Sequence, residues 1–524
     1  MKKKIKFLSV LFSIMTLLAA CSSSSTPTNE TSDGDGGSGS GSGGTIHAAI
    51  PSQPATLDPH MNTAVITSTV ARNVYEQLLT LNSNYEPVPM LAESVDISED
   101  GKTYTFLLRQ GVKFHNGEEM VAEDVVASLE KWIEINSKAN LFKDAEFAIK
   151  DEYTVVLNLP QRVFGILEAI ADKGQFSGIM PKEIAESAGP TGAEEYIGTG
   201  PFKFEEWKQD QYIHLTKFED YSPLDTAPDG LAGKKEALVD EIYFEITADA
   251  STRLAGIQTG EFDVSEGLLI DNYEQLKANP DLEFKQGASN LWLVFNKKQG
   301  VFTDNNMRKA VNAALNKEEI LIGVQSFEEF YRMDSSYMYE EQKNWHSQAG
   351  SENYDVNDVA VTKELLDAAN YNEEEIRILT TRDYDHLYNT AVIAKEQLEK
   401  AGMKVKLDVY DWSTLLEIRS TPEEWDIFIT GFPPVLAPTQ MLILSPDWPG
   451  WTNDEQLSNY LTEIKNSTSN EEAQQIWDEA QGYLWDYLPG VKVGDMFEYV
   501  AHKKEIEGLT FFEGMVLWNV KKTQ

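Results

Sequence analysis

The sequence predicts an α/β fold of two or three domains over residues 45–524. A segment of that length can bury more than one apolar core. Apolar residues alternate with their neighbours over 103–108, as in a half-buried strand. Over 388–401 they recur at helical spacing instead, and Gly402 ends this pattern just before a strand pattern over 405–409. A helix, a tight glycine turn and a strand in succession indicate α/β units.

Further elements follow the same two periods. A second strand is predicted over 155–159, and an amphipathic helix over 122–132 lies between the two strands. Another helix covers 307–315, and we expect Thr303 to be its N-cap. A strand pattern over 376–378 runs directly into polar residues. Helices and strands are therefore mixed along the whole chain.

The first 44 residues predict export and attachment to a surface. Four lysines precede an apolar run over 7–20, which ends in small residues directly before Cys21, the only cysteine of the chain. A basic start, a short apolar core and small residues are typical of a secretory signal, and the run is short for a membrane span. The junction resembles a bacterial lipobox, in which the thiol is acylated. We therefore predict a signal peptide at 1–20 and a lipidated Cys21; a plain secretory signal with an incidental cysteine is the alternative.

The residues after Cys21 are almost all small and polar up to Gly44, so 21–44 is predicted to be a flexible tether. The spelling Gly34-x-Gly36-x-x-Gly39 within it carries no weight, because neither a strand nor a helix pattern flanks it. No later run is long and apolar enough to cross a membrane. We therefore expect a folded body outside the cell, held at one end.

The composition is strongly acidic, with 85 Asp and Glu against 44 Lys and Arg. Without the four lysines of the leader, 40 basic side chains remain and the formal charge is −45. Such a charge repels phosphate backbones and anionic lipid headgroups, which argues against nucleic-acid binding. It favours solubility and, secondarily, mild attraction of cationic ligands.

Short motifs recur in a fixed order along the body of the chain. Several have a structural meaning of their own: Asp100-Gly101, for example, is a turn before an alternating strand. The motifs are Leu57-Asp58-Pro59; Leu91-Ala92-Glu93-Ser94; Asp100-Gly101 with Tyr104, Phe106, Leu108-Arg109 and the run Gly111 to Gly117; Ala122-Glu123-Asp124-Val125; Gly198-Thr199-Gly200-Pro201 with Phe202, Phe204 and Trp207; Arg253-Leu254 with Ile257 to Asp263; Phe295-Asn296; and Met307 to Lys317.

In order and spacing these motifs are similar to the family 5 extracellular solute-binding proteins, the oligopeptide-, dipeptide- and nickel-binding receptors of ABC importers. The resemblance covers essentially everything from residue 45 onward. It implies an α/β two-lobe fold of the periplasmic-binding-protein type (type II, large cluster), with an extra subdomain in the first lobe and a hinge of two crossing strands. The implied hinge strands lie near 285–290 and 490–496. The implied boundaries are 45–288 plus 494–524 for lobe I, with the subdomain at about 82–195, and 289–493 for lobe II.

Candidate ligand contacts lie at strand ends and in loops of the second lobe, where α/β folds present polar groups to a cleft. Arg382 could hold a ligand carboxylate through a bidentate pair, and an ion pair with Asp383 or Asp385 is its alternative role. Trp477 and Trp485 lie in a predicted helix and are predicted to be core. The predicted ligand-binding residues are Asn290, Trp292, Arg382, Asp383, Tyr384, Trp412, Gly431, Phe432, Trp448 and Trp451.

The turn after Phe432 bears on the ligand. Peptide-binding members of the family typically carry an aspartate there, which pairs with the free amine of the peptide. Here the turn reads Phe432-Pro433-Pro434-Val435-Leu436-Ala437-Pro438 and contains no acid. A buried ammonium would lack its partner at this place, although Asp383 or Asp426 could supply the charge from elsewhere.

The resemblance implies a lipid-anchored receptor that captures a peptide or a small peptide-like organic solute between its lobes and delivers it to the permease subunits of an ABC importer. We expect a monomer on the outer face of the cytoplasmic membrane, which is the cell surface in a Gram-positive-type bacterium and the periplasmic side otherwise. Open alternatives are a nickel or metal-chelate receptor, an opine or sugar receptor, a receptor for signalling peptides and an exported hydrolase.

An enzyme is not expected. The sequence has no Gly-x-Ser-x-Gly elbow, no His-Glu-x-x-His helix and no available catalytic cysteine, and none of the seven histidines pair at metal-ligand spacing. We therefore expect no catalytic residues, no cofactor, no bound metal and no nucleic-acid partner.

Overall fold

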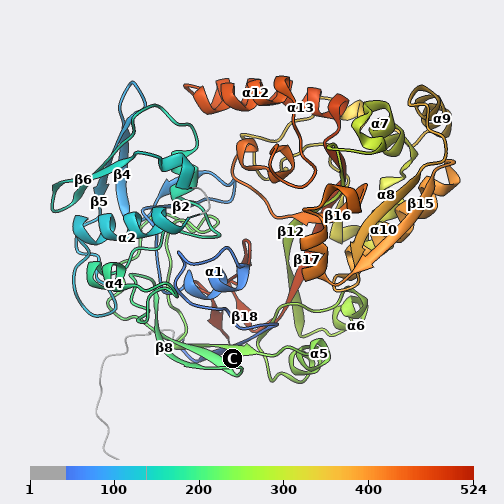
Figure 1. Cartoon of the computed structure of the whole chain (residues 1–524). Coiled ribbons are helices and arrows are strands. Elements are labelled where there is room, and N and C mark those ends of the chain that lie inside the picture. Colours follow the sequence, from blue (N-terminus) through green and yellow to red (C-terminus); the bar gives the residue numbers. More distant parts are fainter. Residues whose placement is uncertain (1–42, 137–138, 524) are drawn as a thin grey trace, which may run out of the picture. The chain divides into compact units, whose positions relative to one another are not determined.

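The computed structural model describes residues 43–136 and 139–523. The predicted signal peptide 1–20, the predicted lipid attachment at Cys21 and nearly all of the predicted tether lie outside the described residues. Within the described part, eleven strands form one large sheet, and four form a separate antiparallel sheet (Figure 1). The order in the large sheet is β15-β14-β16-β12-β17-β11-β1-β10-β9-β8, with β13 paired to β17.

Two long strands carry the large sheet through its middle. β12 (Leu282–Phe295) and β17 (Gly490–Lys503) pair antiparallel from Leu282–Lys503 to Val294–Gly490, with one register shift between Leu291 and Trp292. One end of this pair joins β11, and the other joins β16. Figure 1 shows both strands between the two halves of the chain. They occupy the positions expected of the hinge.

A buried apolar cluster lies on each side of these strands. One cluster draws on residues from Leu291 to Met496, and we call this half lobe II. A second cluster combines Ile46–Val264 with Val500–Val520, and a third lies within Leu78–Ile179 apart from Leu436; the half that contains both is lobe I. This arrangement gives the two-lobe α/β fold. The predicted residue boundaries of the lobes stay a prediction.

Lobe I contains the outer part of the large sheet and several short helices. Its elements are β1 (Thr45–Ile50), α1 (Val65–Ala71), β2 (Leu79–Leu81), β3 (Pro87–Pro89), α3 (Ile166–Ile170), α4 (Lys182–Ser187), β8 (Phe202–Lys208), β9 (Tyr212–Lys217), β10 (Glu241–Ile246), α5 (Ala250–Thr259), β11 (Val264–Ser265), α6 (Tyr273–Lys277), β18 (Ile506–Glu507), β19 (Thr510–Phe511), β20 (Met515–Val516) and β21 (Lys521–Lys522).

The separate four-stranded sheet also lies in lobe I and has the order β4-β5-β7-β6. Gly101, at φ +65°, makes the predicted turn between the first two of these strands, a backbone conformation that favours glycine. Trp132 of the helix α2 is completely buried in the cluster of this sheet. The elements are β4 (Ala92–Ile97), β5 (Thr103–Leu108), α2 (Ala122–Ile135), β6 (Glu146–Asp151) and β7 (Thr154–Asn158).

Lobe II has the predicted α/β units. The strand over 376–378 and the helix–Gly402–strand succession are confirmed, with Gly402 at φ +95°. Trp477 and Trp485 are buried, as expected of core residues. The elements are α7 (Asn305–Ala314), α8 (Lys317–Gln325), β13 (Tyr331–Arg332), α9 (Val359–Ala368), β14 (Glu375–Thr381), α10 (Asp385–Lys400), β15 (Lys404–Tyr410), α11 (Trp412–Ile418), β16 (Ile427–Phe432), α12 (Glu455–Asn466) and α13 (Asn470–Tyr487).

One helix start differs from its prediction. The N-cap of α7 is Asp304 rather than Thr303, and its carboxylate accepts a hydrogen bond from Asn306 N at 2.7 Å. Thr303 instead ends a short 3-10 turn, where its hydroxyl donates to Gly300 O. Aspartate is at least as good an N-cap as threonine, so the carboxylate takes the position one residue later.

In the described residues, no helix combines the length and the apolar character that a membrane span requires.

Candidate functional site

The predicted site residues lie along one edge of the sheet of lobe II. β14 runs parallel to both β15 and β16, and Thr381 pairs with Tyr410 at the end of the first two strands. β16 ends at Phe432, opposite Asn290 of β12. Because parallel strands end at the same edge, the segments that follow Thr381, Tyr410 and Phe432 are brought to one side of the lobe. Two cavities open there.

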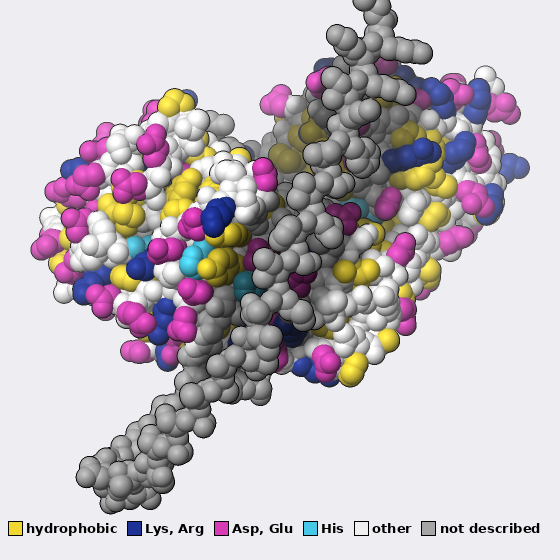
Figure 2. All heavy atoms as spheres, turned by 90° about the horizontal axis from the view of Figure 1, so that it is seen from below, with side chains coloured by type: hydrophobic (Ala, Val, Ile, Leu, Met, Phe, Trp, Pro, Cys, Tyr) yellow, Lys and Arg dark blue, Asp and Glu magenta, His cyan; other side chains and the backbone are white. Residues whose placement is uncertain are grey.

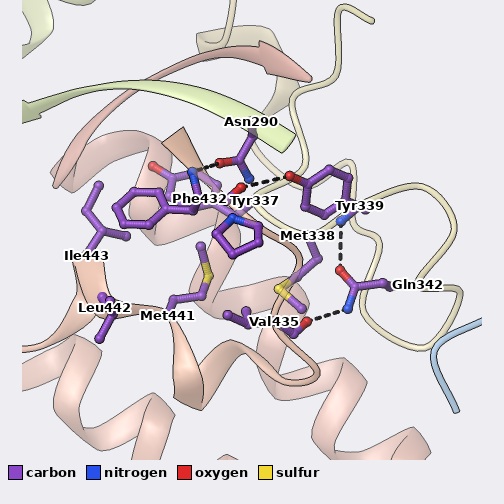
Figure 3. Close-up of a pocket in the computed structure, with 11 residues that line it drawn as sticks. Asn290, Tyr337, Met338, Tyr339, Gln342, Phe432, Val435, Met441, Leu442 and Ile443 are labelled. Atoms are coloured by element: carbon purple, nitrogen blue, oxygen red, sulfur yellow. Dashed lines mark hydrogen bonds between the residues drawn. The ribbon is translucent and has the colours of Figure 1, made fainter. Parts of the chain in front are cut away.

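The smaller cavity has a volume of about 100 Å³ and lies beside the turn after Phe432 (Figure 3). Its wall is mostly apolar, with two methionines and several aliphatic side chains, which suits an uncharged part of a ligand. The lining residues are Asn290, Tyr337, Met338, Tyr339, Gln342, Phe432, Pro433, Val435, Met441, Leu442 and Ile443.

Hydrogen bonds fix the polar part of this wall. Asn290 Oδ1 accepts from Phe432 N at 3.2 Å and from Trp292 Nε1 at 2.9 Å. The Tyr339 hydroxyl donates to Phe432 O at 3.0 Å, and the Gln342 amide donates to Val435 O (Figure 3). The turn is therefore held from both sides by groups that are already paired, and the cavity between them is preformed.

Four predicted residues support this cavity from outside its lining. Trp292 is fully buried, and its ring lies 6.3 Å from that of Phe432. Gly431 has room for no side chain, since an added Cβ would lie 2.9 Å from Asn290 O. The ring of Trp448 lies 5.5 Å from that of Phe432. The ring of Trp451 stacks on Trp425 at 5.6 Å, further along the same aromatic cluster.

The larger cavity has a volume of about 910 Å³ and is bounded by both lobes and by the hinge strand β17. Asp383 and Tyr384, two of the predicted ligand-binding residues, line it. Lobe I contributes Pro51, Arg253, Glu266, Gly267, Leu268, Leu269, Ile270, Asp271 and Phe511; β17 contributes Phe497, Glu498, Tyr499 and Val500; lobe II contributes Gly323, Val324, Gln325, Ser326, Asp383, Tyr384, Asp385, His386 and Asn389.

The remaining predicted residues form a small group at the rim of this cavity. Asp383 Oδ2 accepts a hydrogen bond from Trp412 N at 2.7 Å, and the rings of Tyr384 and Trp412 lie 5.2 Å apart, edge to face. The exposed Arg382 donates to the Tyr388 hydroxyl at 2.9 Å and lies over its ring. The structure thus divides the predicted residues into one group around Phe432 and another around Tyr384.

The larger cavity has two basic side chains in its lining, Arg253 and His386. Arg253 donates to three backbone carbonyls, those of Thr247, Ala248 and Gly267. Burial lowers the pKa of His386, so this ring is uncharged near pH 7. Acidic side chains also spread over the face of the molecule seen in Figure 2. Acidic side chains therefore outnumber basic ones in the lining of this cavity.

The turn after Phe432 meets an ammonium group of the chain itself. Lys173 Nζ of lobe I lies 2.7 Å from Glu513 Oε2 and donates to Pro434 O at 3.1 Å. The two carboxylates considered as substitutes for the missing turn aspartate have other partners: Asp383 accepts from Trp412 N, and Asp426 pairs with Arg377 at 3.1 Å.

Further contacts join the two lobes on the same side. Asn344 Nδ2 donates to Glu86 Oε1 at 3.0 Å, and Arg162 donates to Thr468 O at 2.9 Å. Leu436, from the turn of lobe II, is buried in an apolar cluster of lobe I. The described structure is therefore a closed arrangement of the lobes.

Sequence reasoning missed most of what lobe I contributes. Glu266 follows a quoted motif by three residues, but its own position matched no motif. Lys173 and Glu513 are 340 residues apart, so no local pattern links them. The segment 337–342 has no regular periodicity and was not singled out, although it supplies four residues to the smaller cavity.

Over residues 43–136 and 139–523, no group of three or more His, Cys, Asp or Glu side chains is placed to hold a metal ion.

The fold and the cavity between two lobes are those of a solute-binding protein of the two-lobe type. The family model described as "Bacterial extracellular solute-binding proteins, family 5 Middle" matches residues 86–480. The chain belongs to this family, whose members are solute-binding receptors and not enzymes. The resemblance seen in the sequence motifs is thereby confirmed.

Individual relatives cover almost the whole chain. The "Probable peptide ABC transporter periplasmic-binding protein y4tO" of Sinorhizobium fredii is 26% identical over 89% of this chain and 92% of its own length. The oligopeptide-binding protein AppA of Bacillus subtilis is 24% identical over 99% and 98%. The crystal structure of the ABC transporter substrate-binding protein CtaP of Listeria monocytogenes superposes with a TM-score of 0.78 at 22% identity, over 89% of this chain and 95% of that one.

Proposed function

We propose that the protein is the lipid-anchored receptor of an ABC importer and that it binds a peptide or a small peptide-like organic solute. The observation that carries this proposal is the cavity of about 910 Å³, which is bounded by lobe I, lobe II and the hinge strand together. A ligand in this place contacts both lobes at once and so binds the closed arrangement better than an open one. The names of the two curated relatives support a peptide as the solute.

The two cavities divide the work of recognition. The larger one has the volume for several residues of a peptide and offers charged and polar side chains from three elements. The smaller one accommodates an apolar group beside the turn after Phe432. In this arrangement the predicted contacts at Asp383, Tyr384 and Trp412 belong to the first cavity and those at Asn290 and Phe432 to the second.

Anchoring and delivery complete the proposal. An acylated Cys21 holds the protein at the outer face of the cytoplasmic membrane, and residues 22–44 let the body move around this point. When the lobes close on the ligand, they take a fixed position relative to each other. The surface that they form together is then presented to the permease subunits. The receptor acts as a monomer and releases its ligand chemically unchanged.

Two measurements on the full-length protein, purified from its membrane in detergent, test the proposal. Intact mass spectrometry reads the N-terminus: a diacylated or triacylated Cys21 is expected, and a Cys21→Ser variant should lose both the acyl mass and membrane retention. Native mass spectrometry then identifies the co-purifying solute. If the co-purifying solute is a peptide, and if its removal changes the X-ray scattering as opening of the lobes would, the receptor role is supported. Chemical turnover of the bound molecule would contradict it.

A further inference from the structure

The larger cavity has an excess of negative charge for a site that binds a zwitterion. Its carboxylates come from lobe I, from the hinge strand and from lobe II, so they surround the space rather than share one surface. Its two basic side chains, Arg253 and His386, are respectively engaged by backbone carbonyls and uncharged. The lining carboxylates are Glu266, Asp271, Asp383, Asp385 and Glu498.

Glu266 differs from the other four carboxylates. It directly follows β11, and its backbone N donates to Ala49 O at 3.0 Å, so its backbone is held in place beside the cavity that it lines. Its Oε2 is buried and has no hydrogen-bond partner within the described residues. A buried acceptor without a donor is unfavourable, and a ligand N–H group would remove this deficit.

The groups around Glu266 also favour binding of a donor group at this side chain. Glu498 of β17 lines the cavity and interacts with Glu266 unfavourably, since both are acids. Arg72 and Arg253 offset part of this repulsion. Arg72, however, donates to Phe512 O and Glu513 O, so these N–H groups are already engaged by backbone carbonyls. Arg253 Nε is also buried without a hydrogen-bond partner, and Glu266 lines the cavity, so a donor group of a ligand in the cavity can supply the contact that Glu266 lacks.

We propose that the ligand carries a cationic nitrogen, an ammonium or a guanidinium, which binds against Glu266 with Glu498 beside it. This inference rests on the proposed function and names the class of solute. These two acids take the role of the aspartate that is missing from the turn after Phe432. The ligand amine is bound by lobe I and the hinge strand, in the larger cavity. The nitrogen belongs either to the amino terminus of a peptide or to a basic side chain.

Calorimetry on the full-length protein in detergent separates these sources with four peptides. Ala-norleucine-Ala carries only the terminal amine, acetyl-Ala-Lys-Ala only the side-chain amine, Ala-Lys-Ala both, and acetyl-Ala-norleucine-Ala neither. We expect the last peptide to bind at least tenfold more weakly than the best of the others. Equal binding of all four would overturn the inference while leaving the receptor function intact.

Variants connect the charge preference to Glu266. Glu266→Gln should weaken the best cationic peptide at least tenfold and leave acetyl-Ala-norleucine-Ala within threefold. Glu205→Gln, an exposed carboxylate on β8, is the matched control and should change neither. Glu498→Gln, a change at an exposed position, provides a second test if the first variant folds poorly. Preference that survives both variants would overturn the inference.

A fifth probe separates failure of this inference from failure of the proposed function. If no peptide binds but spermidine does, and Glu266→Gln abolishes that binding, then the cationic site stands and the peptide function falls. If neither peptides nor spermidine bind, both are overturned.

Discussion

Lys173 and Glu513 form a buried ion pair whose ammonium group also donates to Pro434 O across the two lobes. Both side chains are 9% exposed. The hydroxyl of Tyr85 donates to the other carboxylate oxygen of Glu513, at 3.0 Å. The turn that in peptide-binding relatives is expected to carry an acid is thus in contact with a cation supplied by lobe I. This contact belongs to the closed arrangement and is broken when the lobes separate.

Replacement of this lysine should loosen the closed state. Lys173→Met leaves the Glu513 carboxylate buried without its cation and removes the bond to Pro434 O, which should lower the free energy of unfolding by about 3–5 kcal/mol. We expect a larger radius of gyration in X-ray scattering of the unliganded protein. Lys182→Met breaks the exposed pair with Glu123 and serves as control, with a much smaller effect. Equal effects of both variants would contradict the bridging role.

The hinge strand has a position where a single methyl group should be harmful. An added Cβ at Gly287 would lie 2.1 Å from Cε1 of Phe511, a residue that lines the larger cavity. Gly287→Ala should therefore cost about 1–3 kcal/mol through overpacking. Gly189→Ala, with open space around the new Cβ, should change stability by less than about 0.5 kcal/mol. Urea unfolding midpoints give the comparison, and indistinguishable midpoints would contradict it.

The pH dependence of stability should report on Glu266. Burial and then Glu498 raise the pKa of Glu266 to about 7, from an ordinary value of 4.5. Between these two values the folded protein binds more protons here than the unfolded chain, so this group lowers the free energy of unfolding as the pH rises. Glu266→Gln lacks the group. We expect the variant to unfold at a higher temperature than the wild type at pH 8, with the difference shrinking towards pH 5.

Glu498 is present in both proteins, but it interacts with Glu266, so the difference in melting temperature reports the titration of these two acids together. A difference in melting temperature that is the same at pH 5 and pH 8 would show that Glu266 is ionised throughout.

Asn290 should contribute more to the stability of the wall of the smaller cavity than the size of its side chain suggests. Asn290→Ala leaves the buried indole N–H of Trp292 and the backbone N–H of Phe432 without their acceptor, at a cost of about 1–3 kcal/mol. In a Trp292→Phe background the same change should cost less, because one of the two donors is already gone. A double-mutant cycle by chemical unfolding measures this coupling, and strict additivity would contradict the assignment.

Arg382 offers a test of carboxylate recognition at the rim. If it holds the carboxyl terminus of a peptide, then Arg382→Ala should weaken binding of Ala-Lys-Ala about tenfold and leave the carboxamide of the same peptide unchanged. Calorimetry on the two peptides makes the comparison. Unchanged affinity for both, with the fold intact, would leave Arg382 with its observed contact to Tyr388.

The scaffold was predictable because it depends on local patterns. The Asp100-Gly101 turn, the helix that ends before Gly402 and the buried Trp477 and Trp485 each follow from a few neighbouring residues. Part of the edge of the lobe II sheet could also be predicted, because Asp383 and Tyr384 come just after a strand in the sequence. Both residues line the larger cavity.

The lobe I side of the site could not be predicted in this way. Glu266 acquires its character from Glu498, which lies more than 200 residues later, and from a cavity that both lobes enclose. Lys173 has no neighbour in the sequence that marks it as a partner of Glu513. Such pairings arise from the closed packing of the chain and leave no periodic signal.

The pairing of the two hinge strands affects how the receptor moves. β12 and β17 pair from one lobe to the other with a single register shift, between Leu291 and Trp292, so the lobes separate by twisting of this strand pair and not by rotation about a flexible loop. A hydrogen-bonded strand pair resists sliding of one strand along the other, and it returns to its original twist after it is deformed. The open and closed forms that the permease meets should therefore be the same in every cycle. The backbone amides of β12 and β17 should stay protected from hydrogen exchange with solvent throughout.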